Sequence, residues 1–244
     1  MASGRDEANV TFVHSEEHLY SPAGMAYQRA KYGPKIALLR ERFGDRFDGV
    51  RLLDVGVGYG VFLHLLETEH GLGRLFGMDP FPDSVAIARR HTGADIRAGN
   101  ILDECWPFDE ASFDAITCFD VVEHLERPAV FFERAARWLA PGGVLVVTTP
   151  LRLLPYELRR VPFLGVPDRN PTHVSVLPPG EWRRIAEGAG WRVVRAWRGE
   201  HLAHVRLLPR LLRGLCRLLR VDHRRVPVLS AFEQAFCMLL DRPE

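Results

Sequence analysis

The stretch from Leu52 to Gly60, which reads LLDVGVGYG, constrains the fold of this chain more than any other part of it. An apolar run over residues 50–55 predicts a short buried strand. Three glycines follow at alternate positions, and a helical pattern of apolar residues begins at Val61. Because glycine has no Cβ and a helix N-terminus exposes free N–H groups, this turn predicts a ligand site lined by backbone at one edge of a sheet.

Strands and helices alternate through the middle of the chain. The expected strands are 50–55, 74–78, 94–98, 113–119 and 144–149, and the expected helices are 61–69, 83–91 and 128–139. This alternation predicts an α/β fold with a mostly parallel sheet and helices on both faces. Right-handed crossovers bring the C-terminal ends of the strands to one edge. The residues at those ends are Asp54, Asp79, Asn100, Phe119 and Thr149.

The start of the chain is expected to be helical only in part. Residues 1–20 are polar and are expected to be loose. The helical pattern over 22–43 is interrupted at Gly33-Pro34, which predicts two short helices with a break or kink between them. Further on, Asp83 or Ser84 is expected to cap the helix that follows the second strand.

In the last third of the chain, the periodicity of apolar residues predicts fewer helices and strands. Strand 144–149 is expected to follow a turn at residues 141–143. Residues 151–179 are rich in proline and arginine and have no clean period, and so long a connection is usually functional or disordered. A helix over 179–189 and a strand over 191–197 come next, and the apolar stretch 235–240 predicts the last strand.

The composition favours one globular domain with a sizeable core. The chain has 244 residues, is 47% hydrophobic and carries a net charge of +1, so no global field favours nucleic acid. No apolar run is long enough to span a membrane, and neither a signal peptide nor a transmembrane helix is expected. The four cysteines are scattered without a C-x-x-C pair, which favours a reduced, cytoplasmic protein without structural zinc.

The glycine pattern differs from the dinucleotide-binding fingerprint, whose third glycine would fall at Val61. It resembles motif I of class I S-adenosylmethionine-dependent methyltransferases, in particular the small-molecule, type 11 group that includes UbiE and UbiG. Further matching stretches follow in the right order, so the resemblance extends from about residue 50 to about residue 197. These stretches are Asp79, 99–101, 107–116, 119–125 and 139–143.

The resemblance implies a Rossmann-like, doubly wound sheet of seven strands with an antiparallel last strand. It also implies N-terminal helices and inserted helices after strands five and six. Residues 1–244 would form a single methyltransferase domain. Its expected parts are a helical lid (1–49), a cofactor-binding core (50–150) and acceptor-side insertions (151–180 and 199–230).

S-adenosylmethionine is the cofactor that the resemblance implies. Asp79, nineteen residues after Gly60, looks like the acid that accepts the ribose hydroxyl protons, and Asn100 looks like the residue that faces the adenine amine. The residues implied to bind the cofactor are Asp54, Gly56, Gly58, Gly60, Asp79, Pro80, Asn100, Ile101 and Phe119.

Charges near the cofactor are expected to support methyl transfer, which needs mostly positioning and the exclusion of water. Asp54 would supply a negative field near the cation, while the backbone of Gly56 and Phe119 would hold the methionine moiety. From its position on the N-terminal helices, Arg29 is the expected partner of the cofactor carboxylate. Tyr20 or Tyr27 is expected to close over the cofactor.

Two histidines are the candidate catalytic residues if the acceptor is a hydroxyl, because an imidazole titrates near neutral pH and can act as a base. His124 lies on the rim past the fourth strand, and His173 lies where resembling enzymes often have an Asp-x-x-His stretch. The alternative for His124 is packing against helix 128–139. Asp120 and Glu123 could hold a divalent ion, as in some O-methyltransferases. Nothing else in the sequence indicates a metal, so no metal site is expected.

A basic, leucine-rich segment over residues 206–220 has five arginines spaced four, three, four and three apart. This spacing puts the arginines on one helix face and leucines on the other. Such a helix could contact an anionic membrane surface or a lipid substrate. An ordinary half-buried surface helix is the favoured interpretation.

The sequence therefore predicts methyl transfer from S-adenosylmethionine to a small-molecule acceptor, with O-methylation of a metabolite or natural product favoured. N-methylation of an amine and a non-catalytic binding protein with a cofactor fold are the alternatives. The near-neutral charge and the absence of a base-flipping motif disfavour nucleic acid as a substrate. A monomer and a homodimer are both compatible with the sequence.

Overall fold

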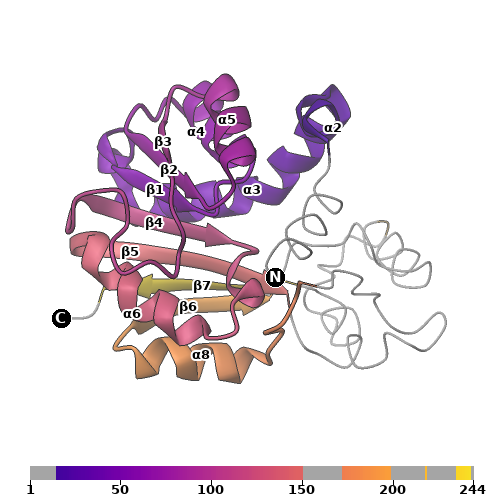
Figure 1. Ribbon diagram of the computed structural model, residues 1–244. Helices are drawn as coiled ribbons and strands as arrows, with labels where there is room; N and C mark the ends of the chain where they lie inside the picture. The colour runs from indigo at the N-terminus through magenta and orange to yellow at the C-terminus, as the bar shows by residue number, and fades with distance from the viewer. Residues whose placement is uncertain (1–14, 151–171, 199–217, 219–234, 243–244) are drawn as a thin grey trace.

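The computed structural model describes residues 15–150, 172–198, 218 and 235–242 (Figure 1). The helices are α2 (Glu16–Tyr20), α3 (Pro22–Phe43), α4 (Val61–His70), α5 (Pro82–His91), α6 (Pro128–Trp138) and α8 (Pro179–Gly188), with 3₁₀ turns η1 (Gly44–Gly49) and η2 (Val122–His124). The strands are β1 (Leu52–Val55), β2 (Leu75–Asp79), β3 (Asp95–Ala98), β4 (Phe113–Phe119), β5 (Leu139–Pro150), β6 (Arg192–Arg198) and β7 (Ala235–Asp241).

These strands form one seven-stranded sheet in the order β3-β2-β1-β4-β5-β7-β6 (Figure 1). The pairs among β1 to β5 are parallel, whereas β7 is antiparallel to both β5 and β6. The strand order reverses between β1 and β4. In open α/β sheets, ligands bind beyond the carboxyl ends of the strands at such a switch point. The predicted fold class, with its antiparallel last strand, is confirmed.

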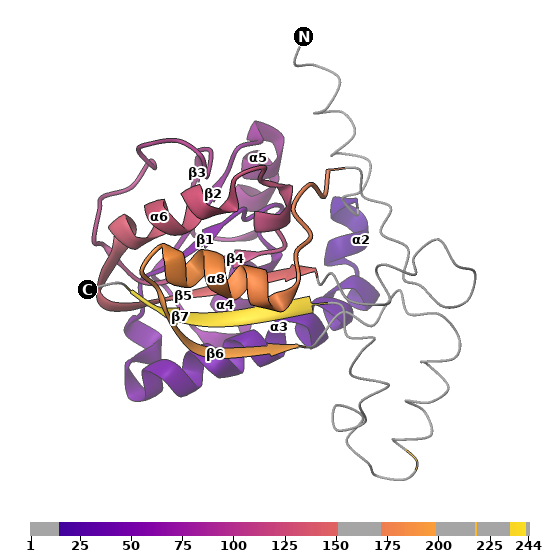
Figure 2. The same ribbon diagram turned by 90° about the horizontal axis from the view of Figure 1, so that it is seen from below.

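The two faces of the sheet carry separate hydrophobic cores because successive side chains of a strand point to opposite faces. On β5, Val144 and Val146 pack into one core while Leu145 and Val147 pack into the other. Helices α3, α4 and α5 cover the first face, and α6 and α8 cover the second (Figure 2).

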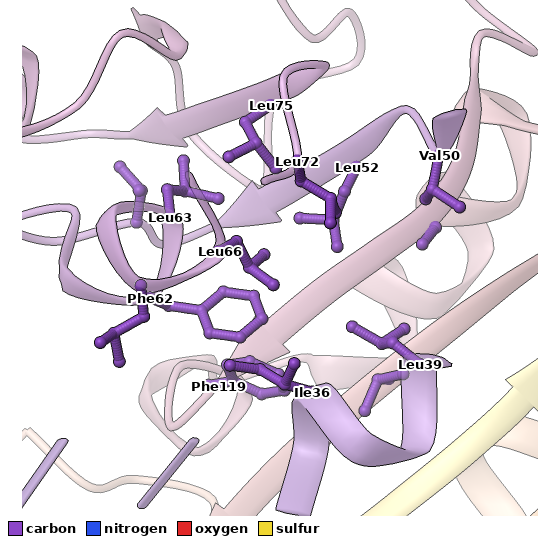
Figure 3. Packing of buried hydrophobic residues seen from close by; sticks show 14 of the residues in the cluster. Ile36, Leu39, Val50, Leu52, Phe62, Leu63, Leu66, Leu72, Leu75 and Phe119 are labelled. Carbon is purple, nitrogen blue, oxygen red and sulfur yellow. The ribbon is translucent and has the colours of Figure 1, made fainter. Parts of the chain in front are cut away.

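The first core joins the N-terminal helix to the strands next to the glycine turn. Ile36 and Leu39 of α3 face Phe62 and Leu66 of α4 across this core, and Phe119 at the end of β4 lies between them (Figure 3). All five are buried. This packing sets α3 close to the carboxyl ends of β1 and β4.

Helix α3 differs from its sequence prediction, because it runs unbroken from Pro22 to Phe43 with Pro34 inside it. A proline within a helix removes one hydrogen bond and crowds the preceding turn. In that turn the Lys35 ammonium donates to the Lys31 carbonyl at 2.8 Å. The buried apolar face of the helix stabilises it further, and this tertiary packing outweighs the local break signal.

Three smaller expectations were also wrong. Residues 16–20, expected to be loose, form α2, which Ser15 caps by accepting from the His18 N–H at 3.2 Å. Helix α5 begins at Pro82 after Phe81, without the side-chain cap expected from Asp83 or Ser84. Strand β5 begins at Leu139, and its register against β4 shifts before Val144, so the expected turn at 141–143 lies within the strand.

Several predicted features lie outside the described residues. These are the looseness of residues 1–14, most of the insertion at 151–180, the insertion at 199–230 and the basic helix at 206–220. Within the described part of the chain, no helix is long and apolar enough to cross a membrane.

Candidate active site

The glycine turn after β1 depends on backbone conformations that favour glycine. Gly56, Gly58 and Gly60 all have positive φ, at 77°, 52° and 81°. The Gly56 N–H donates to the Met78 carbonyl at 2.8 Å, which ties the turn to β2. A Cβ on Gly56 would lie 2.3 Å from a methyl group of Val121, whereas a Cβ on Gly58 would meet nothing within 4 Å. The turn is therefore packed on one side and open on the other.

Asp79 lies beside the open part of this turn. One carboxylate oxygen accepts from the Gly58 N–H at 2.9 Å and the other accepts from the Phe81 N–H at 3.0 Å. Burial raises the pKa of Asp79 from its ordinary value, and these two N–H groups oppose the rise. Each oxygen keeps a lone pair for a further donor. An oriented carboxylate with accepting capacity beside an open glycine turn fits a ligand with two neighbouring hydroxyls, such as a ribose.

Asp54, near the end of β1, is buried and accepts a hydrogen bond from the Thr117 hydroxyl of β4 at 2.6 Å. Burial raises its pKa to about 7, and the charge of Asp79 adds to the rise. The hydrogen bond from Thr117 and the charge of Lys31 act in the opposite direction. A carboxyl group with this pKa can take on negative charge when a cation binds beside it.

Lys31 and Asp120 form an ion pair at the same edge, with Nζ and Oδ2 2.9 Å apart. Burial alone would lower the pKa of Lys31, but the charge of Asp120, the hydrogen bond to it and the nearby tyrosines together raise that pKa. Asp120 has a positive φ of 57° and also accepts from the Thr148 hydroxyl at 3.1 Å. Lys31 was not among the site residues predicted from the sequence. The signal that could have found it is that Lys31 and Lys35 are the only lysines in an arginine-rich chain.

The N-terminal residues expected at the cofactor are placed differently from one another. The Arg29 guanidinium pairs with Glu69 of α4 at 2.7 Å, and that side chain is half exposed. The Tyr20 hydroxyl donates to the carbonyl of Tyr59, inside the glycine turn, at 2.7 Å. Tyr27 is exposed. The structure therefore brings Tyr20 to the turn but directs Arg29 to α4.

The remaining predicted cofactor residues lie at the ends of β2, β3 and β4. Gly99 donates its N–H to the Asp79 carbonyl at 3.1 Å, which links the loop after β3 to β2. In that loop Asn100 is exposed and its side-chain oxygen accepts from the Leu102 N–H at 2.8 Å, while Ile101 is buried. The last two predicted cofactor residues are Pro80, which is exposed, and Phe119, which is buried against the ring of Phe62.

The structure brings together the two histidines that the sequence singles out. Their ring centroids lie 4.9 Å apart. His124 is held by Thr172, whose hydroxyl and carbonyl oxygens lie 2.8 and 3.2 Å from Nδ1. His173 is held by the main chain, because the next two residues, Val174 and Ser175, donate N–H groups to the Glu123 carbonyl at 3.0 and 2.8 Å.

Glu123 lies against this pair and was not among the predicted site residues. Its side chain is fully buried, and its pKa is raised well above the ordinary value by burial and by the charge of Asp120. One oxygen lies 3.9 Å from His173 Nε2. Glu123, His124 and His173 offer donor atoms that all lie within 4.8 Å of one another, so these three residues could hold a metal ion. From the sequence, Asp120 and Glu123 together were the possible ligands of a divalent ion, but the structure pairs Asp120 with Lys31.

A family model described as a methyltransferase domain matches residues 25–196, which is more than half of the chain. The chain belongs to this methyltransferase family. The resemblance to class I S-adenosylmethionine-dependent methyltransferases, seen first in the residues, is thereby confirmed.

Relatives of this methyltransferase have names that agree with the family. A protein of Mycolicibacterium smegmatis named as a probable S-adenosylmethionine-dependent methyltransferase is 34% identical over 154 residues, covering 63% of this chain and 56% of the relative. A ubiquinone biosynthesis O-methyltransferase of Methylocella silvestris is 32% identical over 145 residues, covering 56% of each chain. The chain thus spans little more than half the length of these relatives.

Solved structures share the fold of this methyltransferase. An S-adenosylmethionine-dependent methyltransferase from Mesorhizobium loti has a TM-score of 0.59 at 18% identity, covering 88% of this chain and 100% of that one. Phosphoethanolamine N-methyltransferase 2 of Haemonchus contortus, solved with S-adenosyl-L-methionine, has a TM-score of 0.58 at 18% identity. That match covers 96% of this chain and 61% of the other.

Proposed function

We propose that this chain transfers a methyl group from S-adenosylmethionine to a hydroxyl oxygen of a small molecule. The observation that carries the proposal is the position of the paired histidines. They lie in and beside the turn that follows β4, the strand next to β1 at the switch point, which would put a polar acceptor site next to the glycine turn. The relative named as an O-methyltransferase supports oxygen as the acceptor atom.

The cofactor side is built from the glycine turn and two carboxylates. When bound, S-adenosylmethionine supplies a methyl group on a positively charged sulfur. Asp79 is proposed to accept the ribose hydroxyls, because the Gly58 and Phe81 N–H groups fix its orientation. Asp54 is proposed to stabilise the cationic end, because a carboxylate in a buried setting is screened little by solvent.

The other predicted cofactor contacts stay part of the proposal. Asn100 and Ile101 would contact the adenine, and the backbone at Gly56 and Phe119 would hold the methionine moiety. Tyr20 would stabilise the glycine turn through its bond to Tyr59. For the cofactor carboxylate, Lys31 replaces Arg29 as the proposed partner, because its charge already acts on Asp54 and Asp120.

The acceptor side is proposed to contain His124 and His173 as catalytic residues that help remove the hydroxyl proton. A hydroxyl oxygen is a weak nucleophile until its proton is withdrawn. Residues 1–49 would form a lid in the same single domain, and 151–180 and 199–230 would line the acceptor. Variation outside a conserved core commonly changes the substrate while the core is retained.

The proposal can be tested with paired acceptors that differ only at the reacting atom, such as a phenol and the corresponding aniline, and with methyl-labelled S-adenosylmethionine. We expect label on the phenol and a loss of at least about a hundredfold in turnover for His173→Gln, in the range usual for proton-transfer groups. Cofactor affinity should not change in this variant. His70→Gln is the matched control, since His70 lies on α4 and contacts Arg40. Methylation of the aniline alone would contradict the proposal.

A further inference from the structure

A buried carboxyl group that makes no hydrogen bond among the described residues lies beside the two histidines. Glu123 has 0% of its surface exposed, and neither of its side-chain oxygens has a hydrogen-bond partner among the described residues. The Thr149 hydroxyl lies close enough to oppose the rise in the pKa of Glu123, and it too has no partner within hydrogen-bonding geometry in the part of the chain that the structure describes. His173 Nε2, at 3.9 Å, lies beyond hydrogen-bonding distance. Burying a carboxyl group in this way is costly unless something satisfies it.

The main chain fixes this arrangement, so it does not depend on surface side chains meeting by chance. The residues after His173 are bonded through their N–H groups to the Glu123 carbonyl, and the Ser175 hydroxyl donates to the Leu125 carbonyl at 2.6 Å. His124 is oriented by Thr172, which belongs to the same returning segment. Hydrogen bonds of this kind from histidine to a neighbouring group orient imidazoles that bind metals.

The donor set matches a metal more closely than any other ligand class. Two imidazoles and one carboxylate suit Zn²⁺ and related divalent ions, and three protein donors leave one coordination position open. Bonds of about 2.1 Å in a tetrahedral site put neighbouring donors roughly 3.4 Å apart. The donors here lie within 4.8 Å of one another, so side-chain shifts of about 1 Å would close the site.

We propose that Glu123, His124 and His173 bind one divalent metal ion, with Zn²⁺ the best match to the donors, and that the open position takes the acceptor hydroxyl. The second half of this statement rests on the proposed function. A bound divalent ion would lower the pKa of the acceptor hydroxyl, as it does for metal-bound water, and the proton would pass to water. The oxygen lone pair then forms the bond to the methyl carbon as the carbon–sulfur bond breaks, and its electron pair stays on sulfur. The histidines would then help remove the hydroxyl proton as metal ligands, and the proton itself would pass to water.

Metal binding by the purified full chain tests the proposal without an activity assay. The affinity tag is removed, the protein is stripped with a chelator, and ZnCl₂ is titrated by calorimetry. Binding of CoCl₂ is followed in parallel by the visible absorption of tetrahedral Co²⁺. We expect one ion per chain, and an affinity at least tenfold lower in Glu123→Gln and in His173→Ala. The controls Glu126→Gln and His70→Gln lie outside the cluster and should bind as the wild type does.

Two readouts separate misfolding from a lost site. Glu123→Gln removes a buried carboxylate, so its melting temperature without metal should be no lower than that of the wild type, and its affinity for S-adenosylmethionine should be unchanged. Absence of specific Zn²⁺ binding, or equal binding by Glu123→Gln, would overturn the inference and leave the histidines as bases. If S-adenosylmethionine binds but metal does not, the proposed function survives and the metal site fails. If metal binds but S-adenosylmethionine does not, the metal site stands and the proposed function is refuted.

Discussion

The Asp54→Asn substitution should make the protein more stable and a poorer binder of its cofactor. In the folded chain, burial raises the pKa of Asp54 to about 7 from an ordinary value of 3.8. Between these values the folded state holds a proton that the unfolded state has lost. The contribution of Asp54 to stability therefore falls as pH rises from about 4 to about 7, and it levels off above that.

The size of the effect follows from the difference of about three pKa units. Each unit is worth about 1.4 kcal/mol, so Asn should stabilise the protein by about 2 kcal/mol at pH 5 and by up to about 4 kcal/mol at pH 8. For a chain of this length, 4 kcal/mol corresponds to roughly 10 °C in melting temperature. Asn can still accept the hydrogen bond from Thr117, so that contact should be retained.

Cofactor binding should respond in the opposite direction. A cation bound beside Asp54 favours its charged form, so the wild-type Kd for S-adenosylmethionine should rise about tenfold between pH 8 and pH 6 as the carboxylate becomes protonated. The Asn variant should bind weakly at both pH values. Thr117→Val, which removes the bond that favours the carboxylate, should shift the midpoint of the wild-type dependence to higher pH.

Calorimetry at pH 6 and pH 8, with thermal unfolding at pH 5 and pH 8, measures both effects. Asp114→Asn is the matched control, because Asp114, near the start of β4, accepts the N–H of Arg51, just before β1, at 2.9 Å and so lies at the other end of these strands from Asp54. This control should gain no stability and should bind the cofactor normally. If Asp54→Asn is no more stable than the wild type at pH 8, or if wild-type affinity is flat across this range, the reasoning is refuted.

Two further predictions come from the same edge of the sheet. Gly56→Ala should destabilise the fold by about 2–4 kcal/mol in urea unfolding. Alanine is strained at a positive φ, and its Cβ would clash with a methyl group of Val121. Gly58→Ala, with a positive φ but open space, should cost only about 1–2 kcal/mol; equal losses would contradict the packing argument. Lys31→Met should raise the Kd for S-adenosylmethionine by about tenfold or more, as for a lost hydrogen bond to a charged group. Arg29→Met should leave that Kd unchanged, and the reverse ranking would restore Arg29 as the cofactor's partner.

The order and identity of the core strands could be predicted because each is a short apolar run that ends at a polar residue or a turn. Asp54 and Asp79 were placed correctly at one edge, since parallel strands joined by right-handed crossovers must end there. The unbroken helix through Pro34 could not be predicted, because packing of Ile36 and Leu39 outweighs the local signal.

The cluster around Glu123 could not be predicted from the sequence for a different reason. Its partner His173 lies fifty residues further along the chain, and hydrogen bonds to the Glu123 carbonyl bring it back. Such main-chain bonds carry no sequence pattern, because every residue except proline offers the same N–H group. Lys31 was missed because the sequence does not show which of two cations on one helix, Arg29 or Lys31, faces the end of the sheet.

Titration of the full chain with S-adenosylmethionine tests the central claim most directly. The wild type should bind one molecule per chain. Asp79→Ala should weaken binding at least tenfold, because it removes the carboxylate fixed by the Gly58 and Phe81 N–H groups. Asp83→Ala, at the start of α5, should bind as the wild type does. An absence of binding by the wild type, or unchanged binding by Asp79→Ala, would contradict the account.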